Sequence, residues 1–316
     1  MMGRKIIMGI DTSNYTTSVA LMYTDGELIA NLKRPLTVKS GERGLRQSDA
    51  VFSHIKNIPS LMDEVRLCLG GEVPAAVGVS SRPRNKDGSY MPCFLSGVAA
   101  AQSISAALGI PLYRFSHQCG HIMAAIYSSH AEELIGREHL AFHISGGTTE
   151  LLTVKGAESG FVTEIVGGTL DINAGQLIDR TGVRLGLDFP AGAALEALAL
   201  SYSGKRRAER PALKGCYFNL SGLENKISLL IDKGERPEYI ADYTLCRVSE
   251  AICAACEAYI SENGDMPIVF AGGVMSNSII KKELSRRFTA YFAEPAMSAD
   301  NAVGIAELAR REYIKE

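Results

Sequence analysis

The pattern of apolar and polar positions at the start of the chain predicts strands joined by polar turns. Residues 5–13 form an apolar run that ends in the polar segment 11–13, and residues 16–22 form a second apolar run. Asp25-Gly26 is a hairpin signal, and residues 28–30 follow it. The start therefore predicts the order strand, polar turn, strand, turn, strand.

Helical spacing of apolar residues predicts the longer elements, and short apolar runs predict buried strands between them. Residues 32–48 are polar and glycine-bearing, which predicts a loop. We expect helices at 49–69, 93–108, 238–261 and 302–313, and strands at 75–80, 111–115, 163–168 and 267–271.

Residues 140–152 repeat the arrangement of the N-terminus, with a strand, a turn rich in Gly, Ser and Thr, and a second strand. Two copies of one unit in 316 residues indicate a duplicated α/β fold with a cleft between its halves. We expect lobes at 1–125 and 126–316, with helical insertions in the second. The helix at 302–313 is expected to pack back on the first lobe.

Composition narrows the function classes. The chain is 46% hydrophobic and 22% charged, and its formal charge of −2 excludes a broadly basic nucleic-acid-binding surface. A local patch remains open, because Arg82, Arg84 and Lys86 lie in a turn-rich loop. That loop is either a solvated loop or a contact to phosphate or RNA. A second basic run, residues 205–210, is typical of a solvated loop.

The seven cysteines are an odd number spread over helix-like segments, with no secretion signal and no membrane-spanning apolar run. We therefore expect reduced thiols in a cytoplasmic protein that does not contact a membrane. Cys253 and Cys256 have the spacing of a redox or metal pair, but they lie mid-helix without a second pair, which favours core packing.

His117 and His121 are four residues apart in a segment that begins as a helix after Ser116. That spacing puts both imidazoles on one helix face, where they either bind one metal ion or pack by chance. Gln118 excludes the zinc-protease pattern, which needs Glu directly after the first His. Asp300, before the last helix, is the candidate third ligand, and two His with one carboxylate leave positions open for substrate.

Glycine-containing turns are the candidate nucleotide contacts. Residues 145–149 form a Ser-Gly-Gly-Thr-Thr turn whose backbone N–H groups would hold phosphate, unless it is only a tight hairpin. Gly272-Gly273 follows a buried strand and either admits an adenosine or makes a tight strand-to-helix connection. Asp179 would hold ribose hydroxyls, or is a solvated surface acid.

Several motifs in one order together resemble the tRNA threonylcarbamoyladenosine transferase family, the TsaD or Gcp-like proteins once described as O-sialoglycoprotein endopeptidases. The motifs are His117-x-x-x-His121, Ser145-Gly146-Gly147-Thr148, the segment 167–192 with Gly175, Asp179 and Pro190, the segment 218–223, Gly272-Gly273-Val274 with Asn277, and Asp300-Asn301.

The resemblance implies a duplicated ribonuclease-H-like, actin-like ATPase (ASKHA) fold with two lobes and a central nucleotide cleft. It implies one divalent metal, iron or else zinc, on His117, His121 and Asp300. It also implies an adenylate ligand, threonylcarbamoyl-AMP or ATP, on Ser145, Gly146, Gly147, Thr148, Thr149, Asp179, Gly192, Gly272, Gly273 and Asn277, with possible phosphate contacts at Asp11, Thr12 and Ser13.

The activity implied is transfer of threonylcarbamoyl to a tRNA adenosine next to the anticodon, with partner proteins of that pathway. The chain departs from the family pattern at Thr148, Asn14-Tyr15, the segment 82–94 and Glu224, which indicates a divergent paralogue. Two alternatives follow from these departures. One is a carbamoyl or acyl transferase with another acceptor, and the other is a nucleotide-binding scaffold that performs no chemistry.

Overall fold

The computed structural model describes residues 3–13, 15–37, 45–86, 88–157, 160–204 and 209–316. Contacts divide the chain into two units. Unit 1 comprises Met1–Glu132, Gly156–Val162 and Ala299–Glu316, and unit 2 comprises Glu133–Lys155 and Thr163–Ser298. The helix that ends the described chain therefore belongs to the same unit as the first strands.

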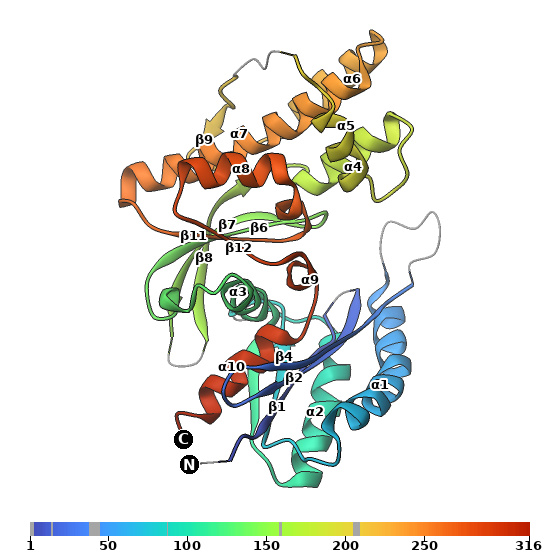
Figure 1. The fold of residues 1–316 in the computed structure, drawn as a ribbon, viewed down its shortest axis with the longest axis vertical. Helices are drawn as coiled ribbons and strands as arrows, with labels where there is room; N and C mark the ends of the chain where they lie inside the picture. The colour runs from blue at the N-terminus through green and yellow to red at the C-terminus, as the bar shows by residue number, and fades with distance from the viewer. Residues whose placement is uncertain (1–2, 14, 38–44, 87, 158–159, 205–208) are drawn as a thin grey trace. The chain divides into compact units, whose positions relative to one another are not determined.

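Unit 1 is built on a five-stranded sheet in the order β3-β2-β1-β4-β5 (Figure 1). The central strand β1 pairs antiparallel with β2 and parallel with β4. The strands are β1 (Ile6–Asp11), β2 (Thr16–Tyr23), β3 (Leu28–Pro35), β4 (Ala76–Arg82) and β5 (Leu112–Ser116).

Helices cover both faces of this sheet, because side chains alternate between the faces along each strand. Ile10 and Val79 pack with Leu61 of α1 (Gln47–Leu69) and with α2 (Phe94–Leu108). On the opposite face lie α3 (His117–Ser128) and α10 (Val303–Tyr313), which pack against each other. A Cβ at Gly9 would lie 2.6 Å from the Ala302 carbonyl oxygen, so the start of α10 lies against the backbone of β1.

Unit 2 carries a seven-stranded sheet in the order β12-β11-β6-β7-β8-β10-β9. Its segment β8-β7-β6-β11-β12 repeats the order of unit 1, again with an antiparallel partner and a parallel partner beside the first strand. The predicted duplication is therefore confirmed. The strands are β6 (His139–Ile144), β7 (Thr149–Gly156), β8 (Phe161–Thr169), β9 (Leu213–Lys214), β10 (Tyr217–Phe218), β11 (Ile268–Ala271) and β12 (Ala290–Phe292).

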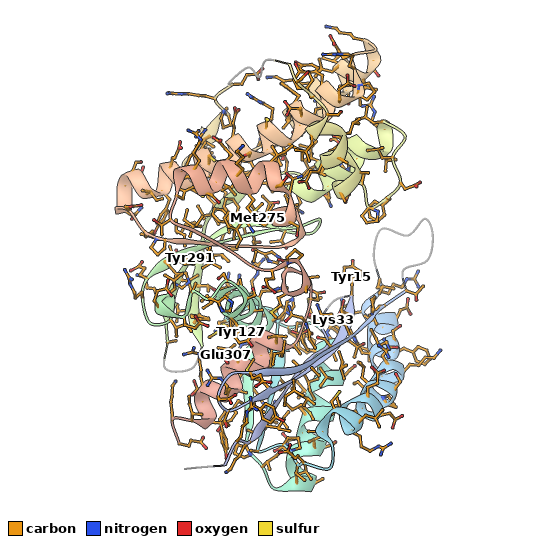
Figure 2. All side chains as sticks on the ribbon, viewed as in Figure 1. Tyr15, Lys33, Tyr127, Met275, Tyr291 and Glu307 are labelled. Atoms are coloured by element: carbon orange, nitrogen blue, oxygen red, sulfur yellow. The ribbon has the colours of Figure 1, made fainter. Side chains whose placement is uncertain are left out.

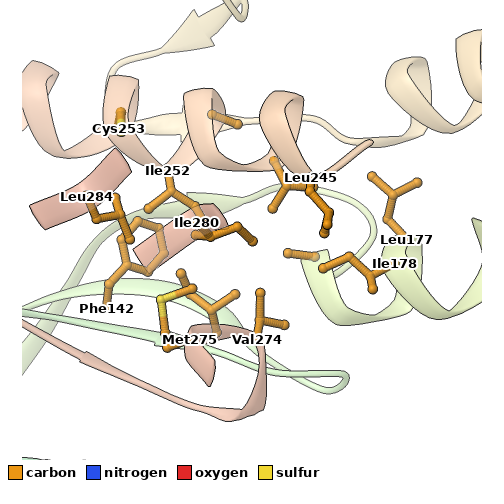
Figure 3. Packing of buried hydrophobic residues seen from close by; sticks show 14 of the residues in the cluster. Phe142, Leu177, Ile178, Leu245, Ile252, Cys253, Val274, Met275, Ile280 and Leu284 are labelled. Carbon is orange, nitrogen blue, oxygen red and sulfur yellow. The ribbon is translucent and has the colours of Figure 1, made fainter. Parts of the chain in front are cut away.

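An apolar core joins this sheet to its helices. Figure 3 shows Phe142 of β6 among Ile252 of α7, Ile280 and Leu284 of α8, all buried. The helices of unit 2 are α4 (Ala174–Arg184), α5 (Gly192–Leu200), α6 (Ser221–Asp232), α7 (Pro237–Asn263), α8 (Ser278–Arg287) and α9 (Pro295–Ser298), with short 3₁₀ turns η1 (Glu132–Leu134) and η2 (Gly273–Ser276).

Strand β3 is longer than its apolar pattern predicted. We expected a loop from residue 32, but the strand continues to Pro35 through Lys33 and Arg34. Both are long side chains on an edge strand, where the stem can cover apolar surface while the charge stays near water. Within the predicted loop, residues 38–44 lie outside the part that the structure describes, as do residues 205–208 of the predicted basic run.

Two smaller expectations concern the cysteines and membranes. Cys253 and Cys256 are buried and free in α7, which confirms that they pack in the core. Among the described residues, no helix is long and apolar enough to cross a membrane.

Candidate functional site

The two predicted metal-ligand histidines lie in the first turns of α3 in unit 1. Strand β5 ends at Ser116, whose hydroxyl oxygen accepts a hydrogen bond from the N–H of Cys119, 3.2 Å away, and so caps the helix. His117 is then the first helical residue and His121 follows one turn later. Their ring centroids are 4.2 Å apart, so the helix start brings the two imidazoles together as the spacing predicted.

Asp300 joins them from the segment before α10. Its Oδ1 lies 3.3 Å from Nε2 of His121 and 3.7 Å from Nε2 of His117. The ligand atoms of the three residues all lie within 4.8 Å of one another. Asn301 fixes this segment, because its side chain donates to the Ala299 carbonyl and accepts from the N–H of Val303. Two imidazoles and one carboxylate gathered around one point suit a divalent transition metal with open positions.

Asp11, at the end of β1, contacts the Nδ1 side of the His117 ring. Its Oδ2 lies 2.8 Å from Nδ1 of His117, and its Oδ1 accepts from the N–H of Ser13 at 2.7 Å. The carboxyl group of Asp11 is fully buried. A carboxylate that accepts from Nδ1–H leaves Nε2 as the metal-binding nitrogen, so Asp11 sets both the tautomer and the ring orientation.

The same contacts set the protonation of this pair. Burial lowers the pKa of His117, but the charge and hydrogen bond of Asp11 and the charge of Asp300 outweigh burial, and the pKa rises to about 9. For Asp11, burial raises the pKa, but the charge and hydrogen bond of His117 and the bonds from Ser13 outweigh it, so the pKa is lowered. A metal ion must therefore displace a proton from His117 when it binds.

Thr12 and Ser13, predicted as phosphate contacts with Asp11, have different surroundings. The hydroxyl group of Thr12 donates to the Cys93 carbonyl and accepts from the N–H of Gly97, both at 3.0 Å, which joins β1 to α2. Ser13 is buried, and its hydroxyl group has no hydrogen-bond partner among the described residues. Internal contacts thus occupy Asp11 and Thr12.

Unit 2 contains a cavity of about 360 Å³. Glycines and small residues make up much of its wall, so backbone forms a large part of the surface. It is lined by Ser145, Gly146, Gly175, Ile178, Asp179, Pro190, Gly192, Ala193, Glu196, Gly273, Val274, Ser276 and Asn277. Six of the ten residues predicted to bind the adenylate are among them, namely Ser145, Gly146, Asp179, Gly192, Gly273 and Asn277, and Gly175 of the family motif also lines the cavity.

The remaining four predicted contacts, Gly147, Thr148, Thr149 and Gly272, are not among the lining residues. The N–H groups of Gly147 and Thr148 donate to the hydroxyl oxygen of Ser145, at 3.2 and 3.1 Å, which closes the turn on itself. The hydroxyl oxygen of Thr149 accepts from the N–H of Ala174 at 2.9 Å and so holds the start of α4. Thr149 therefore supports the wall of the cavity from outside it.

Close backbone packing explains two of the glycines. A Cβ at Gly175 would lie 2.6 Å from the backbone nitrogen of Gly146, so only glycine lets α4 approach the 145–149 turn this closely. Gly272 has a φ of +100°, and a Cβ there would lie 2.1 Å from the carbonyl oxygen of Ile144. A Cβ at Gly273, by contrast, would have nothing within 4 Å, because this residue borders the open cavity.

The polar side chains of the cavity wall also hold helix ends. Asp179 accepts from the N–H of Ala191 at 2.9 Å, and burial raises its pKa although the amides before α5 lower it. Asn277 accepts from the N–H groups of Ile279 and Ile280, both at 3.1 Å, and so caps α8. Both residues thus have structural contacts in addition to their place in the wall.

Glu196 of α5 is a wall residue that no sequence pattern singles out. Its Oε1 accepts from the N–H of Ser278 at 2.7 Å and also from the Ser278 hydroxyl group. It therefore ties α5 to the start of α8 across the cavity wall. Its sequence signal is that of any helix-surface glutamate, so only the fold reveals it.

The departures from the family pattern fall in different places. Glu224 forms an ion pair with Arg180 at 3.1 Å on the surface of unit 2. In the basic loop of unit 1, Arg82 donates to the side chain of Asn85 at 3.0 Å. Tyr15 is exposed beside Asn14, which lies outside the described residues.

Comparison with known proteins identifies the family. The model of the family described as tRNA N6-adenosine threonylcarbamoyltransferase matches residues 40–307. A protein of that name from Streptococcus suis (strain 05ZYH33) is 30% identical over 334 residues, which cover 100% of this chain and 95% of the relative. Another from Aromatoleum aromaticum is 27% identical over 315 residues, which cover 95% of this chain and 89% of the relative.

Solved structures show the same fold at low sequence identity. Full-length HypF in its phosphate- and nucleotide-bound form has a TM-score of 0.60 at 14% identity, covering 97% of this chain and 55% of the HypF chain. A ROK family glucokinase from Streptomyces griseus has a TM-score of 0.51 at 14% identity, covering 98% of this chain and 100% of that chain. The fold is thus the duplicated actin-like ATPase fold, and the extent of the family match shows that this chain belongs to the tRNA N6-adenosine threonylcarbamoyltransferase family of acyltransferases.

Proposed function

We propose that this protein transfers a threonylcarbamoyl group from threonylcarbamoyl-AMP to the N6 amine of a tRNA adenosine next to the anticodon. The observation that carries the proposal is the His117, His121 and Asp300 cluster with Asp11 behind it. A protein that only bound nucleotide would have no need of two histidines and a carboxylate held around one point. Membership of the tRNA N6-adenosine threonylcarbamoyltransferase family supports this acyl group and this acceptor.

The metal that this cluster would hold is iron or zinc. His117, His121 and Asp300 are its ligands, and Asp11 keeps the Nε2 atom of His117 directed to it. Both ions accept nitrogen and carboxylate ligands with positions left open. When bound, the ion supplies Lewis-acid polarisation of an acyl or phosphoryl oxygen.

The cavity of unit 2 is the proposed adenylate site. Its glycine-rich wall lets a nucleotide approach the backbone, and Gly146 of the 145–149 turn borders the cavity. Asp179 retains acceptor capacity beyond its bond from Ala191, which suits ribose hydroxyl groups. ATP contains the same adenosine and phosphate groups as the adenylate and therefore serves as a binding probe.

The transfer balances as an acyl substitution. The N6 amine of adenosine attacks the carbonyl carbon, a C–N bond forms, and the C–O bond to the phosphate breaks. AMP leaves with the electron pair of that bond, and the amine loses one proton to solvent or to a base. The residues of the chain bind the two substrates and orient the carbonyl group, which is the proximity contribution to catalysis. A tRNA acceptor implies a cytoplasmic reaction, with partner proteins of the same pathway assisting it.

The test is transfer by purified, metal-loaded protein from threonylcarbamoyl-AMP to unmodified tRNA, alone and with extract that supplies partner proteins. We expect modified adenosine in the nucleoside digest, detected by mass spectrometry. A tRNA in which guanosine replaces the target adenosine is the matched control and should stay unmodified. If neither condition yields modified adenosine while AMP is still released, tRNA is not the acceptor and the proposal fails.

A further inference from the structure

Phe189 lies in the loop between α4 and α5 of unit 2, and it is 75% exposed. Of the described residues, no large apolar one is more exposed. The next residue, Pro190, lines the proposed adenylate cavity, whereas Phe189 is not one of the lining residues that the structure describes. Phe189 is therefore outside the cavity, one residue along the chain from its wall.

The exposure of Phe189 differs from that of the other large apolar residues next to a wall residue. Those residues are all buried in the apolar core of unit 2, as Figure 3 shows for Leu177 and Met275, and Met275 is also labelled in Figure 2. They are Ile144, Leu177, Leu195 and Met275. A single exposed apolar residue is common on protein surfaces, so the argument depends on how this ring is held and what lies beside it.

The loop that carries Phe189 is held on both sides of the ring. The N–H of Leu187 donates to the Gly182 carbonyl, and the N–H of Ala191 donates to Asp179, both at 2.9 Å. A Cβ at Gly182 would overlap the side chain of Ala191, so the loop packs directly against α4. Leu187 also packs against the core of unit 2. A ring on a fixed loop loses little conformational freedom when a ligand binds to it.

The exposed apolar surface of this loop is small. Phe189 and Pro190 form it, while Asp188 is charged and Gly186 has no side chain. A protein partner requires a wider patch with a well-packed centre. One flat ring is instead suited to a nucleobase, because every base has a face that stacks on an aromatic side chain. Unpaired bases of RNA loops are recognised through such stacking.

The proposed transfer requires an RNA base beside the cavity. The amine of the acceptor adenosine must come within bonding distance of the carbonyl group of a donor that is held there. An adenine of a tRNA loop can reach this position only if it leaves the stack of its neighbours, which costs the energy of unstacking. A ring beside the cavity offsets this cost by stacking on the extruded base. None of the lining residues that the structure describes is aromatic, so Phe189 is the ring nearest in sequence to the wall.

We propose that Phe189 stacks on the acceptor adenine of the tRNA, beside the adenylate cavity of unit 2. The inference rests on the proposed function, since it takes the acceptor and the donor site from it. Binding of RNA needs neither donor nor transfer, so it can be measured apart from activity. The inference and the proposed function can therefore fail separately.

The test measures binding of a labelled, unmodified anticodon stem-loop RNA to the full chain by fluorescence anisotropy. We expect Phe189→Ala and Phe189→Leu to weaken RNA binding about tenfold, because both remove the stacking contact. Phe189→Tyr keeps the ring and should bind like the parent protein. Phe52→Ala is the matched control, since Phe52 in α1 is 69% exposed, and it should bind RNA normally. ATP affinity should be the same in all these variants, because Phe189 lies outside the cavity.

Two further measurements identify the stacked base. The chain contains no tryptophan, so Phe189→Trp introduces a single fluorescent reporter. Addition of the stem-loop should quench its emission, whereas the emission of Phe52→Trp should not change. A stem-loop whose target nucleotide lacks its base should bind the parent protein as weakly as the intact RNA binds Phe189→Ala. Combining the two changes should weaken binding no further, because both remove the same contact.

The outcomes separate the inference from the proposed function. RNA binding that does not depend on the ring overturns the inference, as does equal weakening by Phe52→Ala. Weaker ATP binding by Phe189→Ala also overturns it, because the ring would then contact the adenylate or support the wall. A further loss with the abasic RNA would mean that the ring stacks on another base, which again contradicts the inference. Ring-dependent RNA binding without any transfer would count against the proposed function and leave the inference standing.

Discussion

The metal-ligand cluster of unit 1 and the cavity of unit 2 are built from different parts of the chain. The cluster consists of side chains that bond one another, with Asp11 holding His117 at 2.8 Å and Asp300 lying 3.3 Å from His121. The cavity is lined largely by backbone and small residues, and Asp179 and Asn277 in its wall hold helix ends. The cluster therefore depends on particular side chains being present, whereas the cavity depends on the side chains of its wall being small or absent.

The largest effect is expected when the two histidines of the cluster are removed and unit 2 is left unchanged. In His117→Ala with His121→Ala, two of three ligands are lost, so we expect no stoichiometric metal by mass spectrometry of the native protein. ATP binding to unit 2 should persist if the two sites are built independently. The exposed His130 is the control position, and His130→Asn should retain metal. Stoichiometric metal in the double variant would mean that other residues bind it.

Filling the cavity gives the converse experiment. Gly273→Leu adds a side chain where nothing lies within 4 Å, so the fold should tolerate it while the adenylate loses its space. We expect ATP affinity to fall by about ten- to a hundredfold, as overpacking costs about 1–3 kcal/mol. Metal content should not change. The exposed Gly222, which also has nothing within 4 Å, provides the control Gly222→Leu, and normal ATP binding by Gly273→Leu would place the nucleotide elsewhere.

A subtler variant asks whether orientation of a ligand matters as much as its presence. Both oxygens of Asp11 accept hydrogen bonds, from His117 and from Ser13. In Asp11→Asn, the amide NH₂ group must face one of these donors, so we expect metal affinity to fall by about 10- to 100-fold. Asp25→Asn, at an exposed hairpin carboxylate, is the matched control. Unaltered affinity in Asp11→Asn would show that helix α3 alone orients His117.

The smallest effect concerns the pH dependence of unit 1. His54 is fully buried, and its Nδ1 lies 2.9 Å from the hydroxyl oxygen of Thr17, which also accepts from Asn57. Burial lowers the His54 pKa to about 4, although the charges of Asp11 and Asp300 raise it. In the unfolded chain the ordinary value is about 6.5.

The sign follows from proton uptake. Above pH 6.5 the ring is neutral in both states, so His54 adds no pH dependence. Between about 6.5 and about 4 the unfolded state binds the proton first, so the free energy of unfolding falls by up to about 1.4 kcal/mol per pH unit as pH decreases. Urea unfolding at several pH values measures the slope, and His54→Gln should reduce it. An equal slope in both proteins would assign the acid sensitivity to other groups.

The sequence predicted the fold class because apolar runs and turns repeat, and each run is a local property. The strand pattern of residues 5–22 and its copy at 140–152 correspond to β1 with β2 and to β6 with β7. The continuation of β3 to Pro35 was missed because Lys33 and Arg34 read as loop residues. Edge position and partner strand decide such a segment, and neither is visible in its composition.

The candidate site was predictable only where chemistry follows local spacing. His117 and His121 share a helix turn, so four-residue spacing is enough to bring them together. Asp300 was a candidate third ligand because it precedes the last helix, and the resemblance supported it. The bond between Asp11 and His117 could not be predicted from spacing, because it joins segments far apart in the chain. Thr149 and Glu196 show the same limit, since their roles depend on which helix ends lie beside them.

The position of Asp300 in the chain has a consequence for biosynthesis. During translation both histidines leave the ribosome long before Asp300 and the helix α10 that packs against β1 and α3. A nascent chain therefore carries a two-histidine half-site for most of its synthesis, and the three-ligand site exists only after α10 docks. On the proposed metal assignment, metal insertion is a late step of maturation, and a product truncated before residue 299 would release its ion readily even with unit 2 intact.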